Sequence, residues 1–218
     1  MSPNVFKKGV GVLGVLSAAG LLGYGLSYII EMPNVSPDGF VPTTLESSAD
    51  TSFTFGGILA IFVLLYAFAF LPVNIMFTIK KYRTSPYAIV LACCLICVSS
   101  LIEIINTLPV LAVSIYPSEL ESVSPEILLH LQQVEAIKFL AYDVVGFALI
   151  YVAFFFYAVI YFQKYRWLSL LIFGSIVLFI ANVPCLWIAP EVAVILMVLS
   201  ILAILPVPIF LARKAIEE

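Results

Sequence analysis

Charged side chains are scarce in this sequence. Only 11% of its 218 residues are Asp, Glu, Lys or Arg, whereas 63% are hydrophobic. A soluble domain of this length carries roughly 25% charged residues, and so little polar surface could not cover a water-soluble globule. We therefore expect lipid to surround most of the chain, with no room for a separate soluble domain.

Signatures of chemistry are also missing. There is one His and there are four Cys, but no metalloprotease, serine-hydrolase, phosphate-loop or haem-attachment motif. His130 has no neighbouring residues that could complete a zinc site. Cys93, Cys94 and Cys97 lie in an apolar run, where Cys acts as a small hydrophobic residue. No basic run suits nucleic acid. We expect no metal, no cofactor and no nucleic-acid partner, and the sequence favours a protein that is not an enzyme without deciding the matter.

Six long apolar runs are present instead. About 20 helical residues cross a hydrocarbon layer about 30 Å thick, and the runs lack the alternation of membrane β-strands. We expect an all-α polytopic membrane protein, with residues 1–218 forming a single bundle of six transmembrane helices. The predicted spans are about 9–30, 53–79, 87–115, 134–162, 167–188 and 192–211.

Small residues and prolines add local detail. In the first span, Gly11, Gly14, Ala18 and Gly25 share one face and Ala19 and Gly23 share another. Small faces let membrane helices approach closely, although Gly is common in such helices in any case. The pairs Ser85-Pro86 and Ser124-Pro125 predict helix starts. Pro206 and Pro208 predict a bend or a loosened turn near the end of the last span.

The basic residues predict the orientation. With six spans, every Lys and Arg except Lys138 falls on one side of the membrane. Because basic loops stay in the cytoplasm, we expect cytoplasmic N and C termini and a multi-pass protein of the plasma membrane, the inner membrane of a bacterium. Lys138 lies close enough to the outer surface to extend into it. The basic residues of the cytoplasmic side are Lys7, Lys8, Lys80, Lys81, Arg83, Lys164, Arg166, Arg213 and Lys214.

Two carboxylates fall inside the predicted spans. Ionisable groups at such depth are costly and mark candidate functional sites. At 1.5 Å per residue, Glu103 lies about 24 Å into the third span and Asp143 about 14 Å into the fourth, counted from opposite surfaces. Both positions are then towards the outer half, and the two carboxyls could share a proton. One polar face of the third span contains Ser99, Ser100, Glu103, Asn106 and Thr107.

These residues suggest an outward-opening polar pocket. Tyr142 and Asp143 would contribute from the fourth span and Asn182 from the fifth, and Gly146 leaves space for a neighbouring helix or a ligand. The predicted site is Glu103, Asn106, Tyr142, Asp143 and Asn182. Buried polar groups can also serve only to hold membrane helices together, and for Glu103 and Asp143 both interpretations stay open. Asn74, beside Pro72, is interpreted as replacing backbone hydrogen bonds that the proline removes.

A family resemblance is carried by residues 56–113 and continues through residues 161–167. Within the first range it depends on the link Lys80-Lys81-Tyr82-Arg83 and on the stretch Ile104-Ile105-Asn106-Thr107-Leu108. In this layout the chain resembles the bacterial family called domain of unknown function 4386, which has six spans with an outer loop after the first. The resemblance implies a topology and no activity.

Three functional classes follow. The favoured one is a non-enzymatic binding, sensory or accessory protein that holds a small or amphipathic ligand, or docks a membrane protein or a second copy of itself. The second is a small proton-coupled carrier that uses Glu103 and Asp143, although the two halves show no evident internal repeat. The third is a membrane enzyme that uses the same carboxylates as acid and base.

Overall fold

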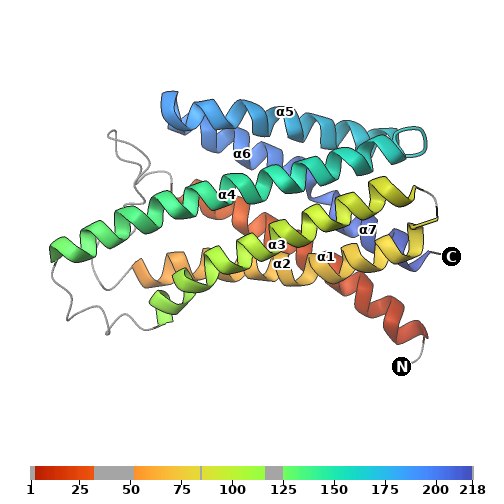
Figure 1. Ribbon diagram of the computed structural model, residues 1–218, viewed down its shortest axis with the longest axis horizontal. Coiled ribbons are helices and arrows are strands. Elements are labelled where there is room, and N and C mark those ends of the chain that lie inside the picture. Colours follow the sequence, from red (N-terminus) through yellow and green to blue (C-terminus); the bar gives the residue numbers. More distant parts are fainter. Residues whose placement is uncertain (1–2, 32–51, 84, 116–124, 218) are drawn as a thin grey trace.

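The computed structural model describes residues 3–31, 52–83, 85–115 and 125–217. Within these ranges the regular structure is all α-helical, as expected (Figure 1). The helices are α1 Pro3–Glu31, α2 Ser52–Lys81, α3 Pro86–Ile115, α4 Pro125–Tyr161, α5 Arg166–Ile188, α6 Pro190–Ile204 and α7 Pro206–Ile216.

Six stretches are long and apolar enough to cross a membrane, which confirms the number of predicted spans. They are Val5–Leu26, Ala60–Lys81, Pro86–Leu108, Val144–Tyr161, Arg166–Cys185 and Glu191–Ile216. Helices α3 and α4 begin at Pro86 and Pro125, the positions that the Ser-Pro pairs predict.

The last of these stretches contains the expected interruption. Pro206 has no N–H to donate to the carbonyl of Leu202, and the N–H of Leu205 reaches that carbonyl instead, at 3.4 Å. Leu205 keeps helical dihedral angles, with φ −49° and ψ −37°. The chain therefore continues from α6 into α7 as one helical element with a loosened turn, within the apolar stretch Glu191–Ile216.

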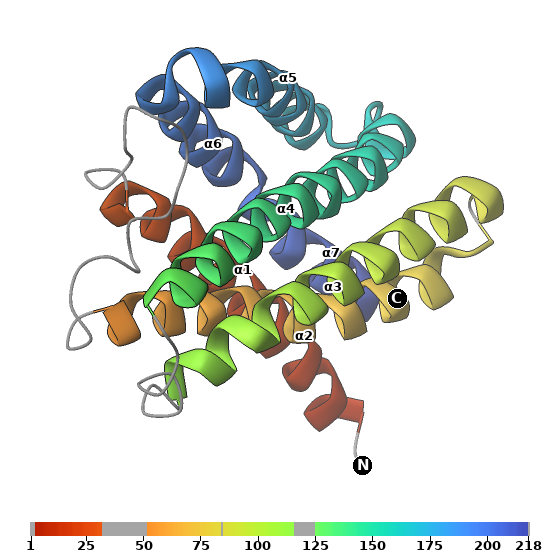
Figure 2. The same cartoon turned by 60° about the vertical axis from the view of Figure 1, so that its left-hand side comes forward.

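The helices form a closed ring in chain order. Each of α1 to α5 packs against its successor, and α6 returns to α1, while α7 packs against α1 and α2. Figures 1 and 2 show α4 between the α5–α6 pair and the α2–α3 pair. Contacts between neighbouring helices alone would leave a void in the middle of the ring. Protein interiors are closely packed, so side chains must fill this space.

Helix α4 supplies much of that filling through five aromatic residues spaced three or four apart, Phe147, Tyr151, Phe154, Tyr157 and Tyr161, here called the α4 aromatic stripe. All but Tyr161 are buried. The stripe reaches five partners on four other helices, with ring centroids 4.5 to 5.9 Å apart: Tyr24, Phe70, Phe77, Phe179 and Phe210. This spacing follows the helical repeat, so the residues share one face.

Small residues of α1 bring its backbone against three neighbouring helices. A Cβ at Gly14 would lie 2.5 Å from the Cβ of Ala212 in α7, and one at Gly25 would lie 3.2 Å from Ile201 in α6. On another side, Gly23 meets the ring of Phe62 in α2. These contacts are those expected of small faces, whereas Gly11 has no neighbour that close.

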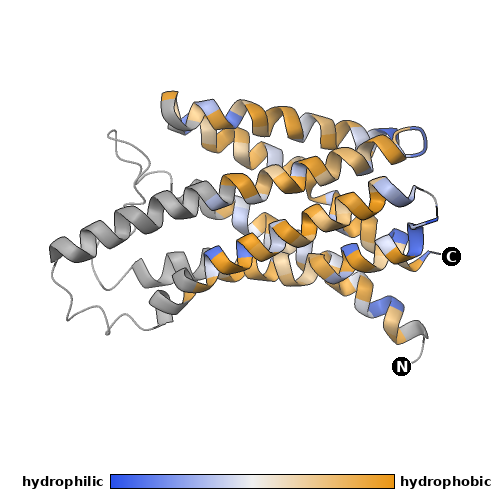
Figure 3. Cartoon of the chain, in the orientation of Figure 1, coloured by the Kyte–Doolittle hydropathy of each residue, from blue (hydrophilic) through white to orange (hydrophobic). Residues whose placement is uncertain are grey.

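The two ends of the bundle differ in charge. Helices alternate in direction, so the start of α1, the α2–α3 and α4–α5 links and the end of α7 lie at one end (Figure 1). Figure 3 shows hydrophilic residues gathered at this end. Every Lys and Arg of the chain except Lys138, whose side chain lies outside the described residues, belongs to the elements of this end.

The closest backbone approach predicts the largest stability effect. A Cβ at Gly20 would lie 2.6 Å from the backbone nitrogen of Tyr66 and 2.8 Å from the carbonyl oxygen of Phe62. Because backbone atoms cannot move aside singly, Gly20→Ala should force α1 from α2 and lower the free energy of unfolding by about 1–3 kcal/mol. The unfolding midpoint in detergent micelles, followed by intrinsic fluorescence, measures this.

Gly174→Ala is the matched control. Gly174 is exposed within α5, and a Cβ there would meet nothing within 4 Å. Its midpoint should stay level or rise, because Ala favours a helix over Gly. Equal midpoints for the two variants would show that α1 and α2 do not pack through Gly20.

Candidate functional site

Glu103 lies at the interface of α3 with α4. Its side chain is only 2% exposed, although it is ionisable. The polar face predicted for α3 is buried as a whole, with Ser99, Ser100, Asn106 and Thr107 each at most 4% exposed. Outward-facing neighbours such as Leu101 and Ile105 are apolar and more than half exposed. Helix α3 is therefore amphipathic in reverse, with its polar face inside the bundle.

Gly146 of α4 provides the space that the Glu103 carboxyl occupies. A Cβ at this position would collide with Oε1 of Glu103. One turn earlier on α3, the hydroxyl of Ser99 donates a 2.8 Å hydrogen bond to the carbonyl oxygen of Gly146. The same glycine thus accepts a bond from one α3 residue and makes room for another, which fixes the register of α3 against α4.

Tyr66 of α2 lies on another side of the same centre. Its ring is buried, and it is close enough to Glu103 and to Tyr151 for electrostatic interaction. In the described part of the chain, the Tyr66 hydroxyl has no hydrogen-bond partner, and the same holds for the hydroxyl of Thr107, one turn from Glu103. Buried polar atoms normally have a partner, so these two atoms retain the capacity to bind another polar group.

A second polar cluster begins at Tyr151 and joins three helices. The Tyr151 hydroxyl is hydrogen-bonded to the hydroxyl of Ser200 in α6. Ser200 and Ser175 of α5 bond reciprocally to each other's carbonyl oxygens, at 3.0 and 2.8 Å, and their hydroxyls lie 3.0 Å apart. These bonds hold α5 to α6 and connect the pair to α4.

The residues predicted for the site do not all come together at Glu103. Asn106 is buried on the same face of α3, but Asn182 of α5 faces α6, where its amide lies 3.7 Å from the sulfur of Met197. Tyr142 is 43% exposed. The side chain of Asp143 lies outside the described residues, although its backbone precedes Gly146 by one turn of α4. The side chain of His130 lies outside the described residues in the same way.

Asn74 differs from its sequence interpretation. Its side-chain oxygen accepts a hydrogen bond from the Tyr157 hydroxyl of α4, so its described role is to join α2 to α4 across the ring. The backbone carbonyl of Asn74 accepts a 2.8 Å bond from the hydroxyl of Thr78 instead. Pro72 has no N–H to donate to the carbonyl of Phe68, so a replacement bond would have to come from Nδ2 of Asn74. This atom has no hydrogen-bond partner among the described residues, so the prediction that Asn74 replaces the bond removed by Pro72 is wrong.

Sequence reasoning missed the tyrosines. Tyr66 and Tyr151 occur in runs rich in Phe and Leu, where a hydroxyl adds little to an apolar pattern. Helical spacing could have indicated Tyr151, because it places this residue on the same face of α4 as Phe147 and Tyr157. Among the described residues, no three His, Cys, Asp or Glu side chains come together, and the four cysteines are free thiols.

Comparisons with models of protein families, with curated proteins and with solved structures find no match to this chain. The resemblance to domain of unknown function 4386 stays a prediction. The argument about function consequently starts from the geometry around Glu103.

The contact between Glu103 and Gly146 can be tested with a double-mutant cycle. Gly146→Ala should displace the Glu103 carboxyl and destabilise the protein, by about 1–3 kcal/mol as for other overpacked positions. In a Glu103→Ala background the added methyl group has space, so Gly146→Ala should cost less there. Unfolding midpoints of the four proteins give the coupling energy, which for contacting residues is about 0.5–3 kcal/mol. If the stability changes of the two substitutions are additive, the Glu103 side chain does not contact Gly146.

Proposed function

We propose that the protein is a multi-pass protein of the plasma membrane with cytoplasmic N and C termini. The support is the concentration of basic residues at the end of the bundle that contains the start of α1 and the end of α7. Basic residues near membrane spans stay in the cytoplasm. With this placement, Glu103 belongs to the outer half of the bilayer, because α3 begins at the basic end and Glu103 lies seventeen residues after Pro86.

The proposed role is non-enzymatic binding, in a sensory or accessory protein. The observation that carries it is a nearly fully buried carboxyl whose neighbours Tyr66 and Thr107 have hydroxyls without hydrogen-bond partners in the described residues. Side chains that only fastened helices together would be expected to bond one another, as Ser175 and Ser200 do. Polar atoms that keep bonding capacity beside a carboxyl are suited to a ligand.

The chemistry of the centre favours a cationic ligand group. A carboxylate attracts any cationic ammonium group. Hydroxyl oxygens accept hydrogen bonds from an ammonium group that has N–H bonds, and they turn their lone pairs towards a quaternary one. The ligand is therefore a small or amphipathic ammonium compound that reaches Glu103 from the outer side, with its apolar part among the helices.

A matched set of ligands tests this role. Decyltrimethylammonium, decanoate and decyl maltoside share a chain length and differ in charge. We expect only the cation to raise the unfolding midpoint of the purified protein in nanodiscs. Glu103→Gln should weaken its binding about 10–100-fold, because a charge-assisted contact contributes about 1.5–3 kcal/mol.

Two controls separate binding from folding. Glu191→Gln removes an exposed carboxylate at the start of α6 and should leave the affinity unchanged. Glu103→Gln must itself keep a cooperative unfolding transition. Equal stabilisation by all three ligands, or a Glu103→Gln variant that binds the cation as tightly as the original protein, would contradict the proposed role.

A proton-coupled carrier is the second candidate, and one observation favours it. Tyr66 interacts electrostatically with both Glu103 and Tyr151. Hydrogen bonds then connect Tyr151 through Ser200 to Ser175. In proteoliposomes that contain a pH-sensitive dye, a carrier would move protons when the ammonium compound is added. Binding without proton movement would favour the first role.

A further inference from the structure

The basic end of the bundle contains a cluster of cations around one tyrosine. The ammonium group of Lys214 in α7 lies 4.8 Å from the ring centroid of Tyr165, in the α4–α5 link, and 5.7 Å from that of Phe210. The ammonium group of Lys164 lies 5.8 Å from the same Tyr165 ring. Two like charges thus share one aromatic ring, an arrangement that draws in an anion.

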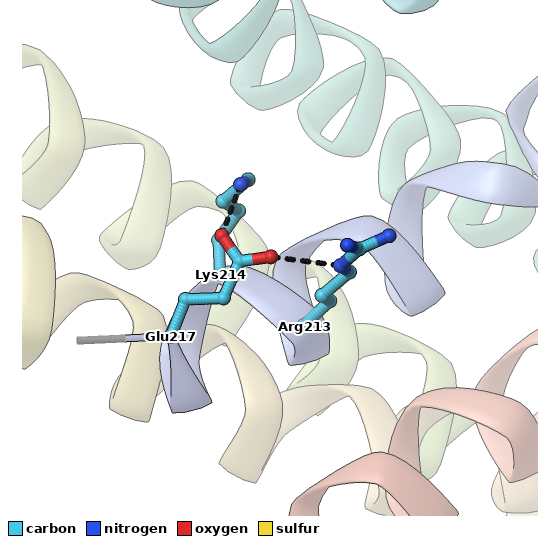
Figure 4. Close-up of polar contacts among 3 residues, drawn as sticks. All are labelled: Arg213, Lys214 and Glu217. Atoms are coloured by element: carbon cyan, nitrogen blue, oxygen red, sulfur yellow. Dashed lines mark hydrogen bonds and ion pairs between the residues drawn. The ribbon is translucent and has the colours of Figure 1, made fainter.

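One carboxylate of the chain already occupies part of this cluster. Glu217 is hydrogen-bonded to Lys214 and accepts a 2.7 Å bond from Nε of Arg213 (Figure 4). The pKa of the Glu217 carboxyl is lowered, chiefly by the hydrogen bond from Lys214 and further by that from Arg213. The lowered pKa means that Glu217 is ionised at neutral pH and that its contribution is lost only when the pH falls below the ordinary range of carboxyl groups.

Glu217 does not balance the cluster. The cluster has four positive charges, from Lys164, Arg166, Arg213 and Lys214. Among the described residues, one carboxylate, that of Glu217, forms salt bridges with this cluster. The Arg213 side chain is 75% exposed and bonds Glu217 through Nε, which leaves its terminal N–H groups available to another partner. Guanidinium N–H groups form paired bonds with phosphate oxygens.

The surroundings match the membrane interface. Trp167 and Phe162 flank the link and are 56% and 37% exposed, and the guanidinium of Arg166 lies 5.8 Å from the Phe162 ring. Exposed Trp and Tyr beside basic residues are typical of the headgroup level of a bilayer. An anion at this place would have apolar surface directly next to it.

We propose that Arg213, Lys214 and Lys164 form a site for the phosphate ester of an anionic phospholipid in the inner leaflet, and that Glu217 competes with the lipid for this site. The proposal uses the membrane placement given above but is independent of the Glu103 centre. The bound phosphate takes over the bonds that Glu217 makes, and the acyl chains lie along the apolar surface of α4 and α5.

Native mass spectrometry of the delipidated protein tests the site. Phosphatidylglycerol is titrated against phosphatidylcholine of the same acyl chains, and glycerol phosphate provides a soluble source of the same ester. We expect phosphatidylglycerol to bind at least tenfold more tightly than phosphatidylcholine. Arg213→Gln combined with Lys214→Gln should remove most of this preference, whereas Glu217→Gln should increase the affinity several-fold because the competing carboxylate is gone.

The matched control removes charge at the same end of the bundle but away from Tyr165. Lys8 is exposed near the start of α1, which Figures 1 and 2 draw away from the α4–α5 link. Lys7→Gln combined with Lys8→Gln, both at the start of α1, should keep the lipid preference. A loss as large as that of the Arg213 and Lys214 variant would overturn the proposal, since binding would then reflect total charge. An unchanged or weakened affinity of the Glu217→Gln variant for phosphatidylglycerol would also overturn the proposal.

The titration with glycerol phosphate shows whether the site takes its phosphate ester from a lipid or from a soluble compound. Weak binding of glycerol phosphate beside strong binding of phosphatidylglycerol supports a lipid site. Equal affinities for the two would overturn the assignment to a lipid, because the acyl chains would then contribute nothing.

Discussion

The structure depends on how the α4 aromatic stripe fills the ring of helices. Five aromatic side chains on one face of α4 contact α1, α2, α5 and α7, and hydrogen bonds from Tyr151 and Tyr157 reach α6 and α2. In lipid, helices associate through close packing and interhelical hydrogen bonds, because there is no water to expel. A helix that provides both to almost every other helix sets the positions of the rest.

The same helix must also approach α3, and Gly146 makes this possible beside the bulky stripe. Gly146 directly precedes Phe147 in the chain, but the two residues face different helices. Gly146 faces Glu103 of α3, whereas the ring of Phe147 stacks on Tyr24 of α1. Glu103 is therefore buried between α3 and α4, close enough to Tyr66 of α2 for electrostatic interaction. Burial of this kind strengthens an interaction between charges.

Much of the topology could be predicted from the sequence, because span length and composition follow directly from the thickness of a bilayer. The six spans, the helix starts at Pro86 and Pro125 and the loosened turn before Pro206 all depend on local chemistry. The polar face of α3 was also visible, since Glu103 and Asn106 stand out in an apolar run.

The partners of these residues could not be read in the same way. Whether Asn182 meets Glu103 or Met197 depends on the rotation of α5 about its own axis, which the packing against α6 decides. Asn74 likewise bonds Tyr157 because the stripe of α4 crosses the ring at that level. Tyr66 carries no sequence signal of its own, since its role comes from the approach of α1 at Gly20 and of α3 at Glu103.

The central claim is that the carboxyl of Glu103 meets the cationic group of a ligand. Infrared difference spectroscopy of the protein in nanodiscs, recorded before and after addition of decyltrimethylammonium, observes this carboxyl directly. A quaternary ammonium group cannot exchange protons, so a spectral change reports the electrostatic contact alone. We predict a ligand-induced carboxyl band in the original protein that is absent from Glu103→Gln. Identical difference spectra for the two proteins would contradict the account.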